Sequence, residues 1–551
     1  MDSEEKMNKT NDEHYILESE RFIFDFLEID EKILHIEGRF VTCSSASVEE
    51  LLLRINNDIE KLDIVHRYTK SLTQANRRSL DFIGFSIRIE IDASDTLYEI
   101  QTEDATRIYY GRFFPVNSDR LPQKYYKHGW ELKVTSHTLI LKKCNLAARI
   151  IGELGVLCKF LASGQAGSKV AVAMKLLCYI ACPFVCKDIL LISDLYCHAD
   201  DNGEALFRYV QQIGDKSIKY VFCIDKDCAD FRRMKQYGHV IHISSWLCRF
   251  YIYLGASIAS SHYTTIQTMM TGILRELKCE NKMILLQHGI TYRDHSSTWN
   301  RYNYGLSMLI AGTTTDYKAM LSYDYFYDER HIKLTGLPRY DLLYEDSKRY
   351  VTVMPTWRMG LVHINADKYD EWTPMPYFEN SQYCLFFNEL LTNTRLLSKA
   401  EEMGYTICFA PHPIIRGCCM QYFTKEEGVR YWSENTPYKE IFAQSDLIVT
   451  DYSSVFFDFA YLRKPLIYCQ FDLEYFLGEG HYPQELGSFN FESDGFGEVE
   501  NTLDGTVDRI IEYMGNGCKL KDKYRTRIES TFPFNDKLNC ERVYRAIRTL
   551  K

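Results

Sequence analysis

Two histidines follow apolar segments that are predicted to form buried strands. His288 comes directly after the run 283–286, and His412 follows the run 405–410 with a proline on each side. Open α/β sheets bind ligands beyond the carboxyl ends of their strands, and an imidazole can take a proton from an attacking hydroxyl near neutral pH. The pattern predicts a general base at His288 and, at the rigidly presented His412, a group that grips a phosphate or stabilises a leaving group. A capping or core histidine is the alternative for His288, and an incidental turn residue for His412.

A second pattern places two hydroxyl residues at the start of a predicted helix. The strand 447–450 ends at Thr450, and Ser453 and Ser454 precede a helix-compatible run that reaches Leu462. Free backbone N–H groups and the helix dipole at such a position favour a phosphate or pyrophosphate. We therefore expect an anion site at Ser453 and Ser454, although an ordinary serine N-cap would explain one of them.

Two arginines have the chemistry of a phosphate clamp. Arg339 lies in the sequence Gly-Leu-Pro-Arg-Tyr-Asp, and Arg358 in Pro-Thr-Trp-Arg. A guanidinium can bind phosphate oxygens through two hydrogen bonds, whereas surface ion pairs are the structural alternative. The sequence has no P-loop, no Gly-x-Gly-x-x-Gly fingerprint and no Gly-x-Ser-x-Gly elbow. These absences disfavour P-loop nucleotidases, nicotinamide dehydrogenases and elbow hydrolases.

The elements that must position these residues form two series. From residue 186 onward, short apolar strands alternate with predicted helices, and a second such series begins near residue 350. This alternation is typical of parallel α/β sheets. We predict two Rossmann-like domains that face one another across a cleft, at 186–348 and 349–551.

The first third of the chain has a different pattern. Residues 1–14 are polar and predicted to be disordered, and 15–144 show short alternating runs that indicate a small β-sandwich. Within it, Ser47 followed by Glu50 predicts a helix over 47–60. Two apolar runs in 145–185 are too short and too charged to span a bilayer. They predict either a helical hairpin packed on the next domain or a basic amphipathic anchor at a membrane interface.

Composition limits the remaining classes. The 551 residues carry 65 basic and 75 acidic side chains, a net charge of −10, which disfavours a nucleic-acid-binding protein. None of the 18 cysteines forms a Cys-x-x-Cys pair, so the spacing favours neither a structural zinc site nor any other metal site. The polar N-terminus predicts no secretory signal, and the thiols are expected to be reduced in the cytosol.

The ordered set of motifs resembles the CDP-glycerol glycerophosphotransferase family, whose members polymerise the polyol-phosphate chains of teichoic acids and similar capsules. The resemblance covers about residues 186–540. One departure is His288-Gly289-Ile290-Thr291, where many members read His-Gly-Thr-Pro, so that acceptor handling could differ. The matching segments are Asp201–Gly203, Ser261-His262, Gln287–Gly289, Gly336–Asp341, Pro355–Arg358, Pro411–Pro413 and Thr450–Asp458.

This resemblance implies a GT-B fold and a peripheral enzyme on the cytoplasmic face of a bacterial membrane. It implies a CDP-polyol donor, glycerol before ribitol, a lipid-linked polyol-phosphate acceptor and an anionic membrane surface as partners. It also implies release of CMP, with His288 as the base. The expected donor-binding residues are Arg339, Arg358, Thr450, Ser453, Ser454 and Asp458, with His412 as a second catalytic residue and Asp458 on the ribose by analogy.

Two other functions remain open from the sequence. One is a GT-B glycosyltransferase that uses a nucleotide sugar, because a fold does not fix its chemistry. The other is a non-catalytic protein that binds a surface polymer, although the presence of both His288 and His412 argues against it. No cofactor is expected, and dependence on a divalent cation is left open.

Overall fold

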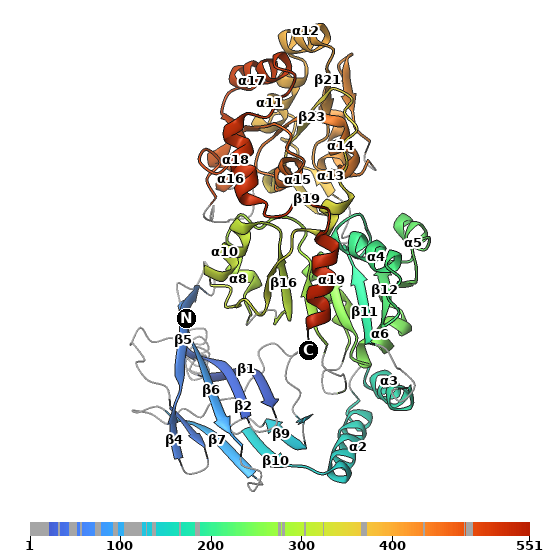
Figure 1. Cartoon of the computed structure of the whole chain (residues 1–551), viewed down its shortest axis with the longest axis vertical. Helices are drawn as coiled ribbons and strands as arrows, with labels where there is room; N and C mark the ends of the chain where they lie inside the picture. Colours follow the sequence, from blue (N-terminus) through green and yellow to red (C-terminus); the bar gives the residue numbers. More distant parts are fainter. Residues whose placement is uncertain are drawn as a thin grey trace, which may run out of the picture.

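The computed structural model has three parts along its long axis, which carry strands β1–β10, β11–β17 and β18–β25 in turn (Figure 1). We call the part built on β11–β17 the first lobe and the part built on β18–β25 the second lobe. The predicted disordered segment 1–14 lies outside the described residues. The structure describes residues 21–30, 33–42, 52–55, 58–71, 79–91, 97–103, 124–127, 129–134, 139–164, 167–181, 188–273, 277, 281–301, 305–322, 324–364, 372–433, 436–478, 480 and 489–550.

The N-terminal part consists of two antiparallel sheets, in the orders β1-β2-β6-β5 and β4-β3-β7-β10-β9-β8. The helix predicted over 47–60 is wrong where this segment is described, because β3 and β4 pair with one another and β3 pairs with β7. Pairing with neighbouring strands outweighs the local capping signal. The bounds are β1 (Arg21–Asp30), β2 (Ile33–Thr42), β3 (Leu52–Ile55), β4 (Asp58–Lys61), β5 (Asp63–Ser71), β6 (Ser79–Glu90), β7 (Leu97–Glu103), β8 (Lys124–Lys127), β9 (Trp130–Val134) and β10 (Leu139–Lys143).

Two helices lead from these sheets to the first lobe. Helix α2 (Leu146–Ala162) begins at Asn145, whose side chain accepts a hydrogen bond from the backbone N–H of Ala148 at 2.9 Å. Helix α3 (Ser168–Ala181) packs against α2 and against α6 (Trp246–Tyr253) of the first lobe. Within the described residues, no helix combines the length and the apolar character that crossing a bilayer requires.

The first lobe is a seven-stranded parallel sheet in the order β13-β12-β11-β14-β15-β16-β17. Its strands are short apolar runs with buried side chains, as a sheet covered on both faces requires. The strands are β11 (Asp188–Ser193), β12 (Ile218–Ile224), β13 (Val240–His242), β14 (Ser257–Ser260), β15 (Met283–Leu285), β16 (Met308–Ala311) and β17 (Ile332–Leu334). Besides α6, the lobe has α4 (Asn202–Gln212), α5 (Ala229–Met234), α7 (Tyr263–Met270), α8 (Ser296–Trp299), α10 (Thr314–Ser322) and the 3-10 turn η3 (Pro338–Leu342).

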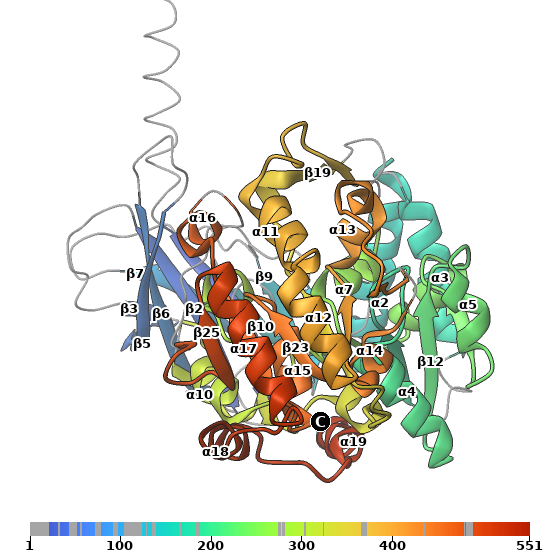
Figure 2. The ribbon, with the colours of Figure 1, turned by 90° about the horizontal axis from the view of Figure 1, so that it is seen from above.

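The second lobe is a six-stranded parallel sheet in the order β22-β21-β18-β23-β24-β25. Figure 2 shows α11, α12 and α17 side by side over it. The two parallel sheets confirm the predicted α/β class. The strands are β18 (Tyr350–Met354), β21 (Thr406–Phe409), β22 (Val429–Tyr431), β23 (Ser445–Thr450), β24 (Leu466–Cys469) and β25 (Gly497–Glu500), beside a small hairpin of β19 (Val362–Ile364) and β20 (Trp372–Pro374). The helices are α11 (Gln382–Leu391), α12 (Thr394–Met403), α13 (Pro413–Cys418), α14 (Tyr438–Gln444), α15 (Val455–Tyr461), α16 (Leu473–Leu477), α17 (Leu503–Gly515) and α18 (Asp522–Thr531).

The last helix returns to the first lobe. Helix α19 (Asn539–Thr549) packs against α4 and η3, and it runs from the second lobe across the first (Figure 1). Asp341 caps it, because its carboxylate accepts from the backbone N–H of Asn539 at 3.0 Å and of Cys540 at 2.7 Å. Gly336 has a φ of 75°, and a Cβ placed on it would lie 1.9 Å from Asn539 Oδ1. The sequence assigned this helix to the second domain, and the structure shows that it also contacts the first lobe through Asp341.

A buried ion triad joins the carboxyl ends of three adjacent strands in the second lobe. Arg358 follows β18, Asp451 follows β23 and Asp472 follows β24. The fully buried guanidinium donates from Nε to Asp472 at 2.8 Å, from Nη2 to Asp451 at 2.9 Å and from Nη1 to the carbonyl of Thr356 at 2.8 Å. Arg358 therefore holds the loops beyond the sheet through contacts with protein groups, and its expected contact with a donor phosphate stays a prediction.

The substitution Gly336→Ala is expected to lower the free energy of unfolding by about 1–3 kcal/mol, because the new methyl group would overlap Asn539. Urea denaturation followed by circular dichroism measures the change. Gly517→Ala is the matched control, since Gly517 has a φ of 76° and no atom within 4 Å of its Cβ position. Equal losses in the two variants would contradict the close packing of α19.

The substitution Arg358→Met is expected to lower the free energy of unfolding by about 3–5 kcal/mol, because it leaves two buried carboxylates without their cation. The same denaturation experiment measures it. Arg395→Met is the control, because Arg395 pairs with Asp508 at the surface and such pairs contribute about 0–1 kcal/mol. A loss in Arg358→Met no larger than in the control would disprove a structural role for the triad.

Candidate active site

Hydrogen bonds among buried polar groups fix the loop that carries His288. Gln287, just after β15, is fully buried and has a φ of 55°, a left-handed conformation that is uncommon for a residue with a side chain. Its side chain accepts a hydrogen bond from Thr291 at 2.7 Å and donates to the carbonyl of Ile310. The Asn202 side chain donates to the Gln287 carbonyl at 2.9 Å. These contacts turn the chain so that the His288 side chain stands 68% exposed.

Ile290 and Thr291, which replace the Thr-Pro of many family members, lie in the interior next to this loop. Ile290 is buried and packs close to Gly312, and Thr291 is buried with its hydroxyl on Gln287. Both residues that differ therefore contribute to internal packing. The sequence suggested a change in acceptor handling, but these side chains do not share the exposure of His288.

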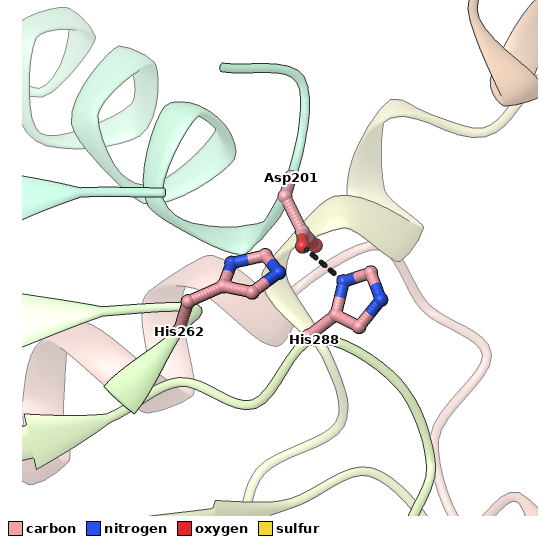
Figure 3. Close-up of side chains that lie close together, drawn as sticks. All are labelled: Asp201, His262 and His288. Atoms are coloured by element: carbon pink, nitrogen blue, oxygen red, sulfur yellow. Dashed lines mark hydrogen bonds and ion pairs between the residues drawn. The ribbon is translucent and has the colours of Figure 1, made fainter. Parts of the chain in front are cut away.

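Asp201 pairs with His288, as Figure 3 shows. Asp201 Oδ2 lies 3.1 Å from His288 Nδ1, and Asp201 also forms the N-cap of α4. Burial would raise the pKa of Asp201, but the charge of Arg339 and the hydrogen bond from His288 outweigh it and hold that pKa below its usual range. A carboxylate has only acceptors, so Nδ1 of His288 carries the proton and Nε2 of the neutral ring can accept one.

The start of α4 is fixed by a second carboxylate. Asp194, just after β11, accepts from the backbone N–H of Gly203 at 2.6 Å and of Glu204 at 2.9 Å, and from the Ser261 hydroxyl. A Cβ on Gly203 would lie 2.4 Å from the carbonyl oxygen of Ser193, so only glycine fits here. This packing explains the glycine of the sequence Asp-Asn-Gly, and it places Asp201 next to His288.

Arg339 connects the two lobes. Its Nη1 donates to Asp201 Oδ1 at 2.7 Å and to the carbonyl of His288, and its Nη2 lies 2.7 Å from Asp458 Oδ2 in α15 of the second lobe. Burial would lower the pKa of Arg339, but the charges of Asp458 and Asp201 raise it well above its usual value. The guanidinium is thus engaged by carboxylates from both lobes, and the expected contacts of Arg339 with a phosphate and of Asp458 with a ribose stay predictions.

His262 lies against His288 with ring centroids 4.4 Å apart. Burial, followed by repulsion from His288 when that ring is protonated, lowers the pKa of His262 to about 3, so the His262 imidazole is neutral at physiological pH. Asp201, His262 and His288 present ligand atoms within 4.8 Å of one another, a set that suits a divalent metal. However, Arg339 donates to the same carboxylate, and its positive charge opposes a cation there.

The serines predicted at an anion site lie across from His288. Ser454 is the N-cap residue of α15 but makes no side-chain capping hydrogen bond, whereas Ser453 Oγ lies 3.5 Å from the backbone N of Val455. A Cβ on Gly289 would lie 2.9 Å from Ser454 Oγ, so the glycine allows the two lobes to approach. Thr450 differs from both serines, because it is fully buried and donates to the carbonyl of Met354 at 2.8 Å. The expected contact of Thr450 with the donor stays a prediction.

His412 occupies the N-cap of α13, at the carboxyl end of β21. Its Nδ1 accepts from the backbone N–H of Ile414 at 3.3 Å, and its ring centroid lies 6.1 Å from that of Trp357. Capping was the alternative function considered for His288, but it is His412 that caps a helix. Because Nδ1 is the acceptor, Nε2–H of the neutral ring is a donor.

Sequence reasoning gave no role to Asp201 and His262, which the structure brings to His288. Both lie in segments that carried the family resemblance, and His262 follows the strand 256–260 just as His288 follows its own. The carboxyl ends of neighbouring parallel strands meet at one edge of a sheet. The rule that identified His288 could thus have identified His262, since β14 and β15 pair.

Comparisons with known proteins identify the family of the chain. A family model described as CDP-Glycerol:Poly(glycerophosphate) glycerophosphotransferase matches residues 177–549. The chain is 29% identical over 553 residues to the Minor teichoic acid biosynthesis protein GgaB of Bacillus subtilis (strain 168), covering 97% of this chain and 60% of that protein. It is 21% identical over 238 residues to the Teichoic acid ribitol-phosphate polymerase TarL of Staphylococcus aureus (strain NCTC 8325 / PS 47), covering 39% of this chain and 37% of that protein.

The fold is also found in a solved structure. The wall teichoic acid polymerase TagF superposes with a TM-score of 0.50 at 14% identity, over 73% of this chain and 98% of that one. The chain spans 60% of the length of GgaB and less of TarL. The family match covers both lobes and every residue of the site described above. The chain belongs to the CDP-glycerol:poly(glycerophosphate) glycerophosphotransferase family.

Proposed function

We propose that the protein transfers a polyol phosphate, glycerol phosphate before ribitol phosphate, from a CDP-polyol to the terminal hydroxyl of a lipid-linked teichoic-acid-like or capsular polymer. The observation that carries the proposal is the exposed imidazole of His288, whose Nδ1 is held by Asp201 while Nε2 can accept a proton. Membership of the family supports the CDP-activated donor. A neutral imidazole beside a free hydroxyl is suited to general-base catalysis.

The reaction is a displacement at phosphorus. The acceptor hydroxyl oxygen forms a bond to the polyol-bearing phosphorus, the bond from that phosphorus to the bridging oxygen breaks, and CMP leaves with that oxygen. The hydroxyl proton passes to His288 Nε2. The N–H groups at the start of α15, with Ser453 and Ser454, and the Nε2–H of His412 bind the pyrophosphate and stabilise the charge that develops on it.

The proposal includes a domain layout. A GT-B pair at 186–348 and 349–551 contains the acceptor side with His288 and the donor side with His412. The β-rich segment 15–144 is an accessory domain, and 145–185 is a helical linker. The two parallel sheets and the TagF superposition support the pair. Within 349–551, α19 contacts the acceptor side, because Asp341 caps it.

The helical linker has the surface of a membrane-interfacial element. Apolar side chains of α2 and α3 are exposed, among them Leu146 at 71%, Ile151 at 70% and Ile180 at 67%. Exposed basic residues accompany them, including Lys159 and Lys169. Such a mixture favours binding to an anionic lipid surface. The enzyme would thereby work as a peripheral protein at the cytoplasmic face of the membrane, where a lipid-linked acceptor is available.

Purified protein is expected to release CMP from CDP-glycerol when a lipid-linked polyol-phosphate acceptor is present, and His288→Ala is expected to lower kcat about 10²–10⁴-fold because the base is lost. Chromatography of the released nucleotide measures the rate, with CDP-ribitol in a parallel reaction. His363→Ala is the control, since His363 is an exposed residue of the β19–β20 hairpin. Acceptor-dependent release of UDP from a nucleotide sugar instead would replace the proposal with the glycosyltransferase alternative.

Replacing Leu146, Ile151 and Ile180 together with serine is expected to weaken binding to vesicles containing phosphatidylglycerol about tenfold or more, because apolar contact with the acyl region is lost. Flotation of protein with the vesicles measures it, and vesicles of phosphatidylcholine alone test the contribution of charge. Leu385→Ser is the control, since Leu385 is 50% exposed on α11 of the second lobe. Unchanged flotation of the triple variant would disprove this membrane surface.

A further inference from the structure

The two oxygens of Asp201 have different partners. Oδ1 accepts from the backbone N–H of Asn202 at 2.8 Å and from Arg339 Nη1 at 2.7 Å. Oδ2 faces His288 Nδ1 at 3.1 Å. Oδ1 therefore accepts two hydrogen bonds from fixed donors, and Oδ2 pairs with the imidazole of His288.

The partners of Oδ1 are themselves fixed, so the two oxygens do not exchange. Arg339 is held by both oxygens of Asp458, at 2.9 Å and 2.7 Å, and its own backbone N–H donates to the Asn202 side chain at 2.9 Å. The Asn202 backbone N–H belongs to the first turn of α4. The carboxylate of Asp201 is thus held in one orientation by groups from both lobes.

The neighbouring ring leaves the opposite nitrogen of His288 available. His262 packs on the imidazole with a tilt of 36° between the rings and is neutral at physiological pH. The His288 side chain nevertheless remains 68% exposed. A histidine whose second nitrogen is bound by a carboxylate is held in a single tautomer and ring orientation.

We propose that Asp201 is a positioning residue that holds His288 in the Nδ1–H tautomer, with Nε2 directed at the acceptor hydroxyl, and that Arg339 and Asp458 lock Asp201 in this role. The tautomer follows from the geometry alone, whereas its use in taking up the hydroxyl proton depends on the function proposed above. The lock also makes the state of the base depend on contact between the lobes, because Asp458 belongs to the second lobe.

The substitution Asp201→Asn tests this proposal sharply. Asn202 N–H and Arg339 require the amide oxygen at the position of Oδ1, so the amide NH₂ must face His288 Nδ1. That nitrogen would then have to accept, which moves the proton to Nε2 and prevents it from acting as a base. We expect kcat to fall about 10²–10⁴-fold with KM nearly unchanged. Asp201→Ala, which leaves the imidazole free to adopt either tautomer, should lose less activity.

A merely structural role predicts the opposite order. Asn retains the acceptor for α4 and Arg339, so Asp201→Asn would then be milder than Asp201→Ala. Asp200→Asn is the matched control, because Asp200 is the preceding residue and pairs with Lys439 rather than with His288. It should leave kcat within about twofold, because the amide keeps an oxygen that can accept from Lys439. The reverse order of activity between the two Asp201 variants would overturn the proposal.

The ¹⁵N spectrum of histidine-labelled protein gives a readout that does not depend on activity. With His288→Gln used to assign the signal, the parent protein and Asp200→Asn should show protonated Nδ1, and Asp201→Asn protonated Nε2. An Nε2–H tautomer in the parent protein would overturn the proposal even if CMP release is observed. Displacement of the His262 and His288 signals together by stoichiometric Zn²⁺, with a gain in activity, would overturn it in favour of a metal site. The expected tautomers without any CMP release would leave the positioning geometry intact and reject the transferase function.

Discussion

The chain of charges from Asp201 through Arg339 to Asp458 is the interaction on which the site depends. It joins the start of α4 in the first lobe to α15 in the second, through side chains that are largely withdrawn from water. Charges in such surroundings are tolerated only when they are paired and hydrogen-bonded, and removal of one partner typically costs about 3–5 kcal/mol. The orientation of the Asp201 carboxylate that faces His288 therefore depends on a contact between the lobes.

Several motif residues act by making room or by fixing backbone. Gly203 lets α4 approach β11, Gly336 lets α19 approach η3, and Gly289 leaves space for Ser454. Gln287 has the strained backbone conformation of this loop, and its buried side-chain hydrogen bonds stabilise that conformation. A larger side chain at any of these glycines would meet a neighbouring atom within 3 Å. Several residues of the family motifs therefore serve the packing around the site and not its chemistry.

The second lobe uses charge differently. Its arginine motif forms a closed triad in which Arg358, Asp451 and Asp472 satisfy one another at the ends of adjacent strands. Burial raises the pKa of Asp451, and the charge of Arg358 opposes this rise. The triad leaves the start of α15 and His412 as the polar groups of this lobe that are proposed to meet the donor. Rigid loops beneath them would present N–H groups in fixed directions, which is how such groups stabilise developing charge.

The sequence by itself determined the two parallel sheets, the position of His288 beyond β15 and the place of Ser454 at the start of α15. Each of these follows from local patterns: apolar runs, a histidine after a strand, and serines before a helix. It did not determine the partners of the charged residues. Asp201 and His288 are 87 positions apart, and Arg358 lies 93 from Asp451 and 114 from Asp472. Strand order and the contact between the lobes bring these groups together, and no local pattern records that order. For the same reason the sequence indicated only phosphate chemistry for Arg339 and Arg358, while the tertiary structure pairs both with carboxylates.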